Sequence, residues 1–287
     1  MKTLKKPPWL KKRIPPYQDL LKVKTLLEES GLHTVCEEAH CPNLGECFSQ
    51  GTATFLILGD ICTRNCGFCA VRHGTPVPPA EDEPNRIGRV VVEMGLHYVV
   101  ITSVTRDDLP DGGASLFART IEAIREQDQG IKIEVLVPDF RGDLSSLEII
   151  LRASPDVLNH NIETIPRLYS EVRPQANYKR SLHLLKESRR SYPWIHTKSG
   201  FMLGLGETHE EVLDLMEDLR GVGCDLLTIG QYLQPRSDRL PVKRYIPPEE
   251  FEEYQKIGMK IGFKAVASGP FVRSSFHASQ MFASTSN

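Results

Sequence analysis

A strong net charge, a long apolar run and an apolar leader are all missing from this sequence. The 35 lysines and arginines nearly balance the 37 acidic residues and leave a net charge of -2, so no strong field favours nucleic acid as the main partner. No run approaches the roughly 18 apolar residues of a membrane span. The segment 1–9 has neither an apolar signal core nor the character of an amphipathic, Ser-rich transit peptide. We therefore expect a cytoplasmic protein without a membrane segment.

Cysteine, in contrast, is abundant and unevenly placed. The chain has seven cysteines, and an odd number without a secretion signal argues against a disulfide framework and for thiolate metal sites. The simplest partition is two triplets and one spare residue. The spare is Cys224, which we interpret as a buried apolar residue.

One triplet consists of Cys62, Cys66 and Cys69, directly after a probable strand. Its spacing differs from that of a zinc ribbon and from that of a bacterial ferredoxin. Three thiolates leave one iron of a 4Fe–4S cluster open to a small ligand, which an enzyme needs and an electron carrier does not. Gly67 is expected to allow close backbone approach to the cluster, and Phe68 to shield it from water. A zinc site or scattered free thiols are the alternatives.

The other triplet consists of Cys36, Cys41 and Cys47, with three glutamates between the thiols. Acidic neighbours raise the pKa of a thiol, so these residues are poor candidates for free nucleophiles, whereas a metal holds the sulfur atoms deprotonated. We predict a second iron–sulfur cluster whose fourth ligand comes from elsewhere in the chain. The alternative is a zinc knuckle completed by His40.

From residue 54 onward, apolar segments typical of strands alternate with helical patterns. The expected strands lie near 54–59, 97–103, 131–137, 156–161, 195–203 and 225–231, and the expected helices near 85–95, 113–127, 143–153, 166–190 and 208–222. Because neighbouring parallel strands need crossovers, six such units predict a parallel sheet, and their periodicity favours a barrel. The chain that follows residue 231 is too short to complete eight units. We predict an α/β fold, a partial (β/α)6 TIM-type barrel with N-terminal and C-terminal extensions.

The predicted domain division has three parts. Residues 1–53 form an N-terminal extension that carries the first thiol triplet and a helix near 19–31, and residues 54–245 form the partial barrel. Residues 246–287 form a C-terminal extension that closes the barrel, with a helix that has Phe251, Tyr254, Ile257 and Ile261 on one face.

Polar groups and glycines follow several of the expected strands, where the functional loops of such a barrel gather. Asp111 is followed by two glycines that either cap a turn or present N–H groups to an anion. Asn161 and Glu163 alternate to one side of a strand end, which suits ribose hydroxyls, although loop solvation is the common alternative. The glycines around Gly204 let the backbone approach an adenine edge, but their spacing resembles a dinucleotide fingerprint only weakly.

Taken together, these residues resemble the lipoyl synthases of the radical S-adenosylmethionine (SAM) superfamily. The likeness runs from about residue 7 to residue 278. The superfamily motif is the triplet at 62, 66 and 69, and the triplet at 36, 41 and 47 is specific to the family. Other matching segments are Arg106-Asp-Asp-Leu109, Val137-Pro-Asp-Phe-Arg-Gly142, Asn159-His-Asn161, Lys198-Ser-Gly200, Gly204-Leu-Gly-Glu207, Gln231-Tyr-Leu-Gln-Pro235 and Gly269-Pro-Phe-Val-Arg-Ser-Ser275.

The resemblance implies an enzyme that inserts two sulfur atoms at carbons 6 and 8 of an octanoyl chain amide-linked to a lysine of a lipoyl carrier protein. It implies two 4Fe–4S clusters and SAM as cofactors. Cys62, Cys66 and Cys69 would hold the cluster that binds SAM. The auxiliary cluster, which is the sulfur donor, would be held by Cys36, Cys41, Cys47 and Ser275. Without the resemblance, nothing in the sequence singles out Ser275. Asn161, Glu163, Arg173 and Gly204 are the implied SAM contacts.

The implied partners are octanoylated carrier domains, a ferredoxin- or flavodoxin-type reductant and an iron–sulfur cluster carrier. The carrier domains belong to 2-oxoacid dehydrogenase acyltransferase subunits and to the glycine-cleavage carrier protein. Another radical SAM sulfur-inserting enzyme and a two-cluster electron-transfer protein are the alternatives. Two positions depart from the family pattern: Phe276 replaces the usual Tyr, and Arg239 stands where the family usually has His.

Overall fold

A computed structural model describes residues 5–11, 17–49 and 54–285 of the chain. These residues fold into two compact units. The N-terminal unit comprises Arg13–Arg64 and Ala70–Leu158, and the C-terminal unit comprises Met1–Lys12, Asn65–Cys69 and Asn159–Asn287. Among the described residues, no helix is both long and apolar enough to cross a membrane.

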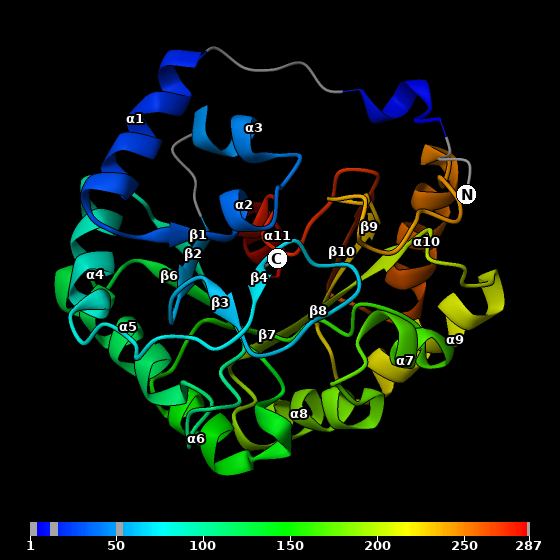
Figure 1. The fold of residues 1–287 in the computed structure, drawn as a ribbon. Coiled ribbons are helices and arrows are strands. Elements are labelled where there is room, and N and C mark those ends of the chain that lie inside the picture. Colours follow the sequence, from blue (N-terminus) through cyan, green and yellow to red (C-terminus); the bar gives the residue numbers. More distant parts are fainter. Residues whose placement is uncertain (1–4, 12–16, 50–53, 286–287) are drawn as a thin grey trace. The chain divides into compact units, whose positions relative to one another are not determined.

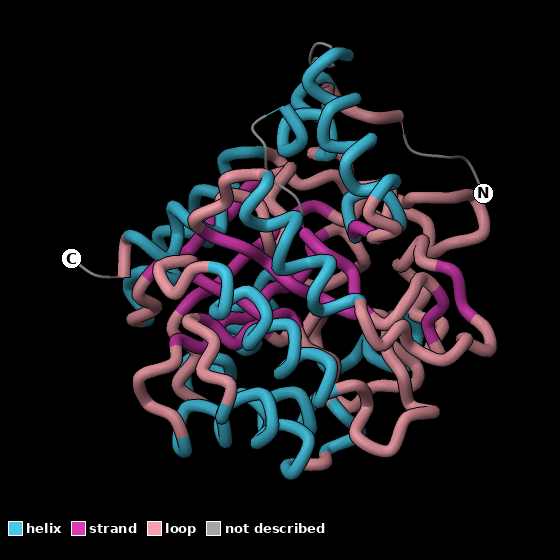
Figure 2. The backbone as a smooth tube through the Cα atoms, turned by 90° about the vertical axis from the view of Figure 1, so that its left-hand side faces the viewer, coloured by secondary structure: helices cyan, strands magenta, loops and turns pink. Residues whose placement is uncertain are grey.

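The N-terminal unit alternates helices and parallel strands after a small helical start (Figures 1 and 2). Its helices are α1 (Tyr17–Glu29), α2 (Val35–Glu38), α3 (Leu44–Ser49), α4 (Glu83–Glu93), α5 (Ala114–Gln127), η2 (Phe140–Gly142) and α6 (Leu144–Arg152). Its strands are β1 (His33–Thr34), β2 (Thr54–Ile57), β3 (Ile61–Cys62), β4 (Arg72–His73), β5 (Tyr98–Ser103) and β6 (Lys132–Leu136), and the chain leaves the unit through β7 (Val157–Asn159).

Strands β2, β5 and β6 of this unit pair in parallel, with Thr54 opposite Val100 and Tyr98 opposite Lys132. Strand β1 adds to β2 in the antiparallel direction. The strands are short, apolar and mostly buried, as a sheet covered by crossover helices requires. Helices α4, α5 and α6 provide these crossovers beside the strands (Figure 1). The structure thus confirms the expected strands at these three places.

The C-terminal unit continues the same alternation (Figure 1). Its helices are η1 (Pro8–Leu10), η3 (Pro166–Leu168), α7 (Tyr169–Val172), α8 (Tyr178–Ser191), α9 (His209–Gly221), α10 (Pro248–Ile261) and α11 (Ala278–Ala283). Its strands are β8 (His196–Leu203), β9 (Leu226–Gln231) and β10 (Ala265–Gly269), which pair in parallel in this order. Helix α10 buries Phe251 and Tyr254 in the core of the unit, while Ile257 and Ile261 pack against that core.

Two sequence-based expectations for this unit need correction. The helix expected over 166–190 is broken into three pieces, because Pro174 disfavours helical backbone at Arg173 and the side chain of Asn177 caps a new helix by accepting the Arg180 N–H at 3.0 Å. Strand β10 was not predicted. Its sequence, Ala-Val-Ala-Ser-Gly, has little strand propensity, and only its pairing with β9 identifies it.

The predicted three-part domain division stays a prediction, and its boundary at residue 53 lies outside the described residues.

Candidate functional site

The thiol triplet at 36, 41 and 47 lies in the N-terminal unit, on two short helices and the turn between them. Thr34 caps α2 by accepting the Glu37 N–H at 3.3 Å, and this cap places Cys36 in the first turn, 4% exposed. The chain then bends back, so that the Cys41 N–H donates to the Cys36 carbonyl at 3.0 Å. Helix α3 carries Cys47, whose N–H donates to the Asn43 carbonyl at 2.9 Å.

In the described part of the chain, these three thiols do not all lie as close together as the ligands of one zinc ion, and their binding of an iron–sulfur cluster stays a prediction. Burial, with the nearby Cys41 and Cys47, raises the pKa of the Cys36 thiol to about 12, so a bound metal is needed to hold its sulfur as a thiolate. A tetrahedral zinc ion with bonds of about 2.3 Å needs sulfur atoms roughly 3.8 Å apart. Among the described residues, the triplet forms no group whose ligand atoms all lie within 4.8 Å of one another, with or without the exposed His40.

A group that does meet this spacing is His33, Glu38 and Asp60. His33 Nδ1 lies 3.4 Å from a Glu38 oxygen, and Asp60 pairs with Arg72. Because the protein already balances these charges, we assign no ion to this group.

Cys62 ends strand β3 of the N-terminal unit. Its sulfur accepts two backbone N–H groups, from Arg64 at 3.4 Å and from Thr105 at 3.3 Å. Two such donors stabilise negative charge on sulfur, which is the state that a cluster ligand must hold. The Thr63 hydroxyl donates to the Thr105 carbonyl at 2.9 Å, and this bond fixes the β3 end to the loop that follows β5.

A buried ion-pair network secures the same loops. Arg64 is almost completely buried and donates to both oxygens of Asp107, at 2.7 and 2.8 Å, and to Asp139 at 2.7 Å. Burial alone would lower the pKa of the Arg64 guanidinium, but the bonds to the two carboxylates raise it above its usual value. Arg64 is therefore permanently charged, and it links the loops after β3, β5 and β6.

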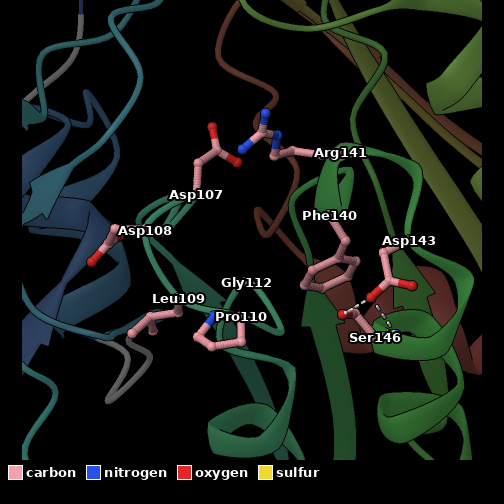
Figure 3. Close-up of a pocket in the computed structure, with 9 residues that line it drawn as sticks. All are labelled: Asp107, Asp108, Leu109, Pro110, Gly112, Phe140, Arg141, Asp143 and Ser146. Atoms are coloured by element: carbon pink, nitrogen blue, oxygen red, sulfur yellow. Dashed lines mark hydrogen bonds between the residues drawn. The ribbon is translucent and has the colours of Figure 1, made fainter.

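A cavity of about 430 Å³ lies between the loops that follow β5 and β6 (Figure 3). It is lined by Asp107, Asp108, Leu109, Pro110, Gly112, Phe140, Arg141, Asp143 and Ser146. Its rim holds no free anion site at the start of α5, because Asp111 itself takes the N–H groups of Gly113 and Ser115, at 2.9 and 2.8 Å. Of the two interpretations of this Gly-Gly segment, the capped turn is the correct one.

Cys66 and Cys69 lie in a turn of the C-terminal unit, where the Cys69 N–H donates to the Cys66 carbonyl at 3.2 Å. Gly67 holds the turn from both sides, since its N–H donates to the Val172 carbonyl at 2.9 Å and its carbonyl accepts the Leu240 N–H at 3.0 Å.

A methyl group on Gly67 would lie 2.9 Å from Leu240 Cδ1 and 3.0 Å from the Glu171 carbonyl oxygen. The glycine is therefore required by its protein neighbours as well as by any cluster. The Phe68 ring packs against the core of this unit.

Asn161, Glu163 and Arg173 come together at the carboxyl end of β7. Asn161 Nδ2 donates to Glu163 Oε1 at 3.0 Å, and Arg173 Nη1 donates to the Asn161 carbonyl at 2.8 Å. Burial raises the pKa of Glu163, although Arg173 and Asn161 oppose the shift. Glu163 also has a left-handed backbone, with φ of 68°, which is unusual for a residue with a side chain and is typical of functional sites.

The same Asn161 amide group reaches the C-terminal segment. Its Nδ2 donates to the Ser274 hydroxyl at 2.6 Å, a bond between residues 113 positions apart, which sequence patterns do not reveal. Ser275 is half-buried in the turn after β10, and its hydroxyl makes no hydrogen bond with the described residues. Phe276 packs its ring on His277, with centroids 4.0 Å apart. These contacts place Ser275 in the same unit as Asn161 and Glu163.

Gly204 has a local explanation. Its N–H donates to Glu207 Oε1 at 2.5 Å, and a methyl group on it would lie 2.2 Å from Gln231 Nε2 and 2.4 Å from the Arg244 carbonyl. With φ of 100° it also has a backbone that favours glycine. Packing alone thus accounts for this glycine, and its contact with SAM stays a prediction.

Comparison with known proteins first defines the class. The model of the radical SAM superfamily matches residues 56–219, more than half of the chain. Among solved structures, HydG, a maturase of the [FeFe]-hydrogenase, has a TM-score of 0.57 at 15% identity and covers 94% of this chain and 69% of its own. Methylornithine synthase has a TM-score of 0.51 at 14% identity, with 78% of this chain and 66% of its own covered. The fold is the partial α/β barrel of radical SAM enzymes.

The particular family follows from the nearer relatives. The N-terminal domain of lipoyl synthase matches residues 1–41. The lipoyl synthase of Caldanaerobacter subterraneus subsp. tengcongensis is 55% identical over 276 residues, or 96% of each chain. That of Syntrophotalea carbinolica is 56% identical over 276 residues, or 96% of this chain and 89% of its own. The chain belongs to the lipoyl synthase family and is an enzyme.

Proposed function

We propose that this enzyme inserts sulfur at carbons 6 and 8 of an octanoyl chain carried in amide linkage on a lysine of a lipoyl carrier domain. Membership of the family supports the reaction. The observation that carries the proposal is the pair of thiol triplets, Cys36, Cys41 and Cys47 within twelve residues of the chain and Cys62, Cys66 and Cys69 within eight. One triplet alone would serve SAM cleavage, whereas sulfur insertion also needs a sulfur source.

We propose that Cys62, Cys66 and Cys69 hold the cluster with an open iron. When bound, this cluster supplies the electron that cleaves SAM into methionine and the 5′-deoxyadenosyl radical, which removes hydrogen from the octanoyl chain. The protein contributes the two N–H donors on Cys62 and the backbone clamp on Gly67. Both keep the thiolates oriented and limit the access of water.

We propose that Cys36, Cys41, Cys47 and Ser275 hold the auxiliary cluster, which is the sulfur substrate. The Ser275 hydroxyl supports this assignment, because it makes no hydrogen bond with the residues that the structure describes and so its oxygen can act as a ligand. A serine oxygen is a hard ligand and binds iron–sulfur clusters weakly, so it is easily displaced. That property suits a cluster that must change during turnover.

Asn161, Glu163, Arg173 and Gly204 are proposed to contact SAM. Both Asn161 Nδ2 hydrogens are used, by Glu163 and by Ser274, whereas the buried Asn161 amide oxygen has no partner among the described residues. This oxygen and the Glu163 carboxyl are two neighbouring acceptors, which suits the donating hydroxyls of a ribose. Arg173 supports both through its bond to the Asn161 carbonyl. In the domain division that we propose, these residues belong to the barrel (54–245), between the extensions 1–53 and 246–287.

The proposed partners are the octanoylated carrier domains named above, an external one-electron reductant of the ferredoxin or flavodoxin type, and an iron–sulfur cluster carrier. The proposed location is the cytoplasm. These finer assignments rest on the likeness of the chain to its family.

Anaerobic turnover of an octanoylated carrier peptide, followed by mass spectrometry, tests the function. We expect near eight irons per chain and a product that carries two added sulfur atoms. Cys41→Ala is expected to keep SAM cleavage and lose the lipoyl product, and Cys66→Ala is expected to lose both. A fully reduced preparation that never exceeds four irons per chain would contradict the two-cluster assignment. An intact eight-iron protein without lipoyl product would contradict the function.

A further inference from the structure

We propose that Arg239 is a positioning residue that places a permanent positive charge beside the turn of Cys66 and Cys69 and thereby favours the reduced form of the cluster bound there. The inference rests on the proposed function of these two cysteines. It concerns the position at which this chain departs from the usual His of its family.

Arg239 lies in the segment after β9 and is held against the cysteine turn. It is only 9% exposed, and its Nη1 donates to Asn65 Oδ1 at 2.6 Å. Asn65 directly precedes Cys66, and its own N–H is fixed by Gln175 Oε1 at 2.7 Å. The Arg239 carbonyl accepts from Gln234 Nε2 at 2.7 Å. The guanidinium is thus hydrogen-bonded to the residue that directly precedes a proposed cluster ligand.

Among the described residues, Arg239 pairs only loosely with a carboxylate. Asp238 lies 4.0 Å from Arg239 Nε, is 60% exposed, and bonds more closely to Arg236, at 3.1 and 3.0 Å. Arg239 Nε is buried and has no hydrogen-bond partner in the described part of the chain. A buried cation with a vacant donor is costly unless an anion completes it. A cluster with its thiolates is such an anion.

Hydrogen bonds connect the segment of Arg239 to the cysteine turn. The Tyr232 hydroxyl donates to the Leu240 carbonyl at 2.7 Å, and the Leu240 N–H donates to the Gly67 carbonyl at 3.0 Å. Arg239 directly precedes Leu240, and Gly67 lies between the two cysteines of the turn, in the same unit. Burial raises the pKa of Tyr232, and the positive charge of Arg239 opposes this shift.

A fixed cation at this place has a definite effect. Reduction adds one negative charge to the cluster, and a nearby positive charge stabilises the reduced form more than the oxidised form. A guanidinium keeps its charge at every working pH, whereas the His of the family pattern is largely neutral above its ordinary pKa. Arg239 therefore makes the electron from the external reductant easier to accept, without a dependence on pH.

The test is an anaerobic redox titration of the full-length holoprotein. The reduced cluster is followed by electron paramagnetic resonance, and the signal that changes on SAM addition identifies the cluster of Cys66 and Cys69. The variants are Arg239→Gln, which removes the charge and keeps a donor for Asn65, and Arg239→Lys, which keeps the charge and loses the fork. The matched control is Arg190→Gln, which removes an exposed guanidinium of α8 that is paired with Glu187 and, among the described residues, forms no hydrogen bond or ion pair with Asp238 or Arg239.

At a fixed solution potential, we expect the ratio of reduced to oxidised cluster to fall about tenfold in Arg239→Gln. This change corresponds to a lowering of the reduction potential by about 59 mV for one electron. Arg239→Lys and the control should stay within about twofold of the parent chain. Equal potentials in the parent and in loaded Arg239→Gln protein would overturn the proposal, as would an equal shift in both Arg239 variants. If Arg239→Gln does not load iron, Arg239→His decides: its potential should fall below that of the parent chain as the pH rises past the ordinary pKa of an imidazole, and a potential equal to that of the parent at every pH would overturn the proposal.

The assay is separate from the test of function. A chain that makes no lipoyl product but shows the Gln-specific shift would keep this inference and lose the proposed function. If the parent chain makes the product and Arg239→Gln shows no shift in potential, the proposed function stands and this inference is lost.

Discussion

Gly67→Ala is the substitution for which the structure gives the clearest magnitude. The added methyl group would lie 2.9 Å from Leu240 Cδ1 and 3.0 Å from the Glu171 carbonyl oxygen. Leu240 Cγ would also lie at 3.0 Å, so the whole leucine side chain must shift, whereas the carbonyl belongs to the backbone and can move only with its chain. Overpacking of this kind costs about 1–3 kcal/mol. Alanine recovers about 0.4–1 kcal/mol by restricting the unfolded chain, so the expected net cost is about 1–2 kcal/mol.

This cost falls on the turn that carries Cys66 and Cys69. A loss of 1–2 kcal/mol corresponds to about a 5–30-fold change in a folded-to-unfolded ratio, and we expect the turn to release iron to a chelator more readily by about this factor. The assay is anaerobic chelator challenge of a Cys36→Ser, Cys41→Ser, Cys47→Ser background, in which only one cluster can form. The double variant Gly67→Ala, Leu240→Ala should recover part of the iron retention, because it removes the contacts of the added methyl group with the leucine side chain.

Gly221→Ala is the matched control for this experiment. Gly221 ends α9 in the same unit, and nothing lies within 4 Å of the position of its methyl group. Alanine there should be neutral or stabilise the helix by up to about 1 kcal/mol. If Gly67→Ala retained iron as well as this control did, the steric reasoning about the turn would be wrong.

Two further predictions concern the C-terminal unit. Ser274→Ala removes the acceptor of the 2.6 Å bond from Asn161, a contact worth about 0.5–1.5 kcal/mol, so amide hydrogen exchange over 270–277 should rise about 2–10-fold. Ser284→Ala, which removes an exposed hydroxyl bonded within its own helical turn, should leave this exchange unchanged, and equal rates in both variants would count against the Asn161 link. Burial raises the pKa of Cys224 to about 12, so iodoacetamide at pH 8 should label it about a thousandfold more slowly than an ordinary thiol. The labelling rate should rise about tenfold per pH unit up to pH 10, since the thiolate fraction does so below the pKa. Labelling is followed by mass spectrometry, and rapid labelling of Cys224 in the native protein would contradict its burial in the structure.

The sequence was sufficient where one residue pattern decides the outcome. The apolar segments that became β2, β5 and β6 are buried on both faces, so their composition alone marks them. The two cysteine triplets are equally clear in the sequence, because a chelating segment needs its ligands close together in the chain, and their role as cluster ligands stays a prediction.

The rest depended on contacts between distant segments. Strand β10 exists because β9 offers it a partner, and the Asn161–Ser274 bond crosses 113 positions. Arg239 illustrates the same limit. In the sequence it is a departure from the family pattern without an evident role, whereas the structure gives it Asn65 as a partner. Such pairings are fixed by tertiary structure and leave no local signal.

Strand β10 has a consequence for shortened forms of the chain. It pairs with residues 226–230 along one side of β9 and covers their hydrogen-bonding groups. A chain cut before residue 265 would lose Ser275 and also leave a long, apolar strand edge exposed to other molecules. We expect such a fragment to self-associate, so C-terminal deletions of this enzyme are poor tests of the proposed ligand role of Ser275.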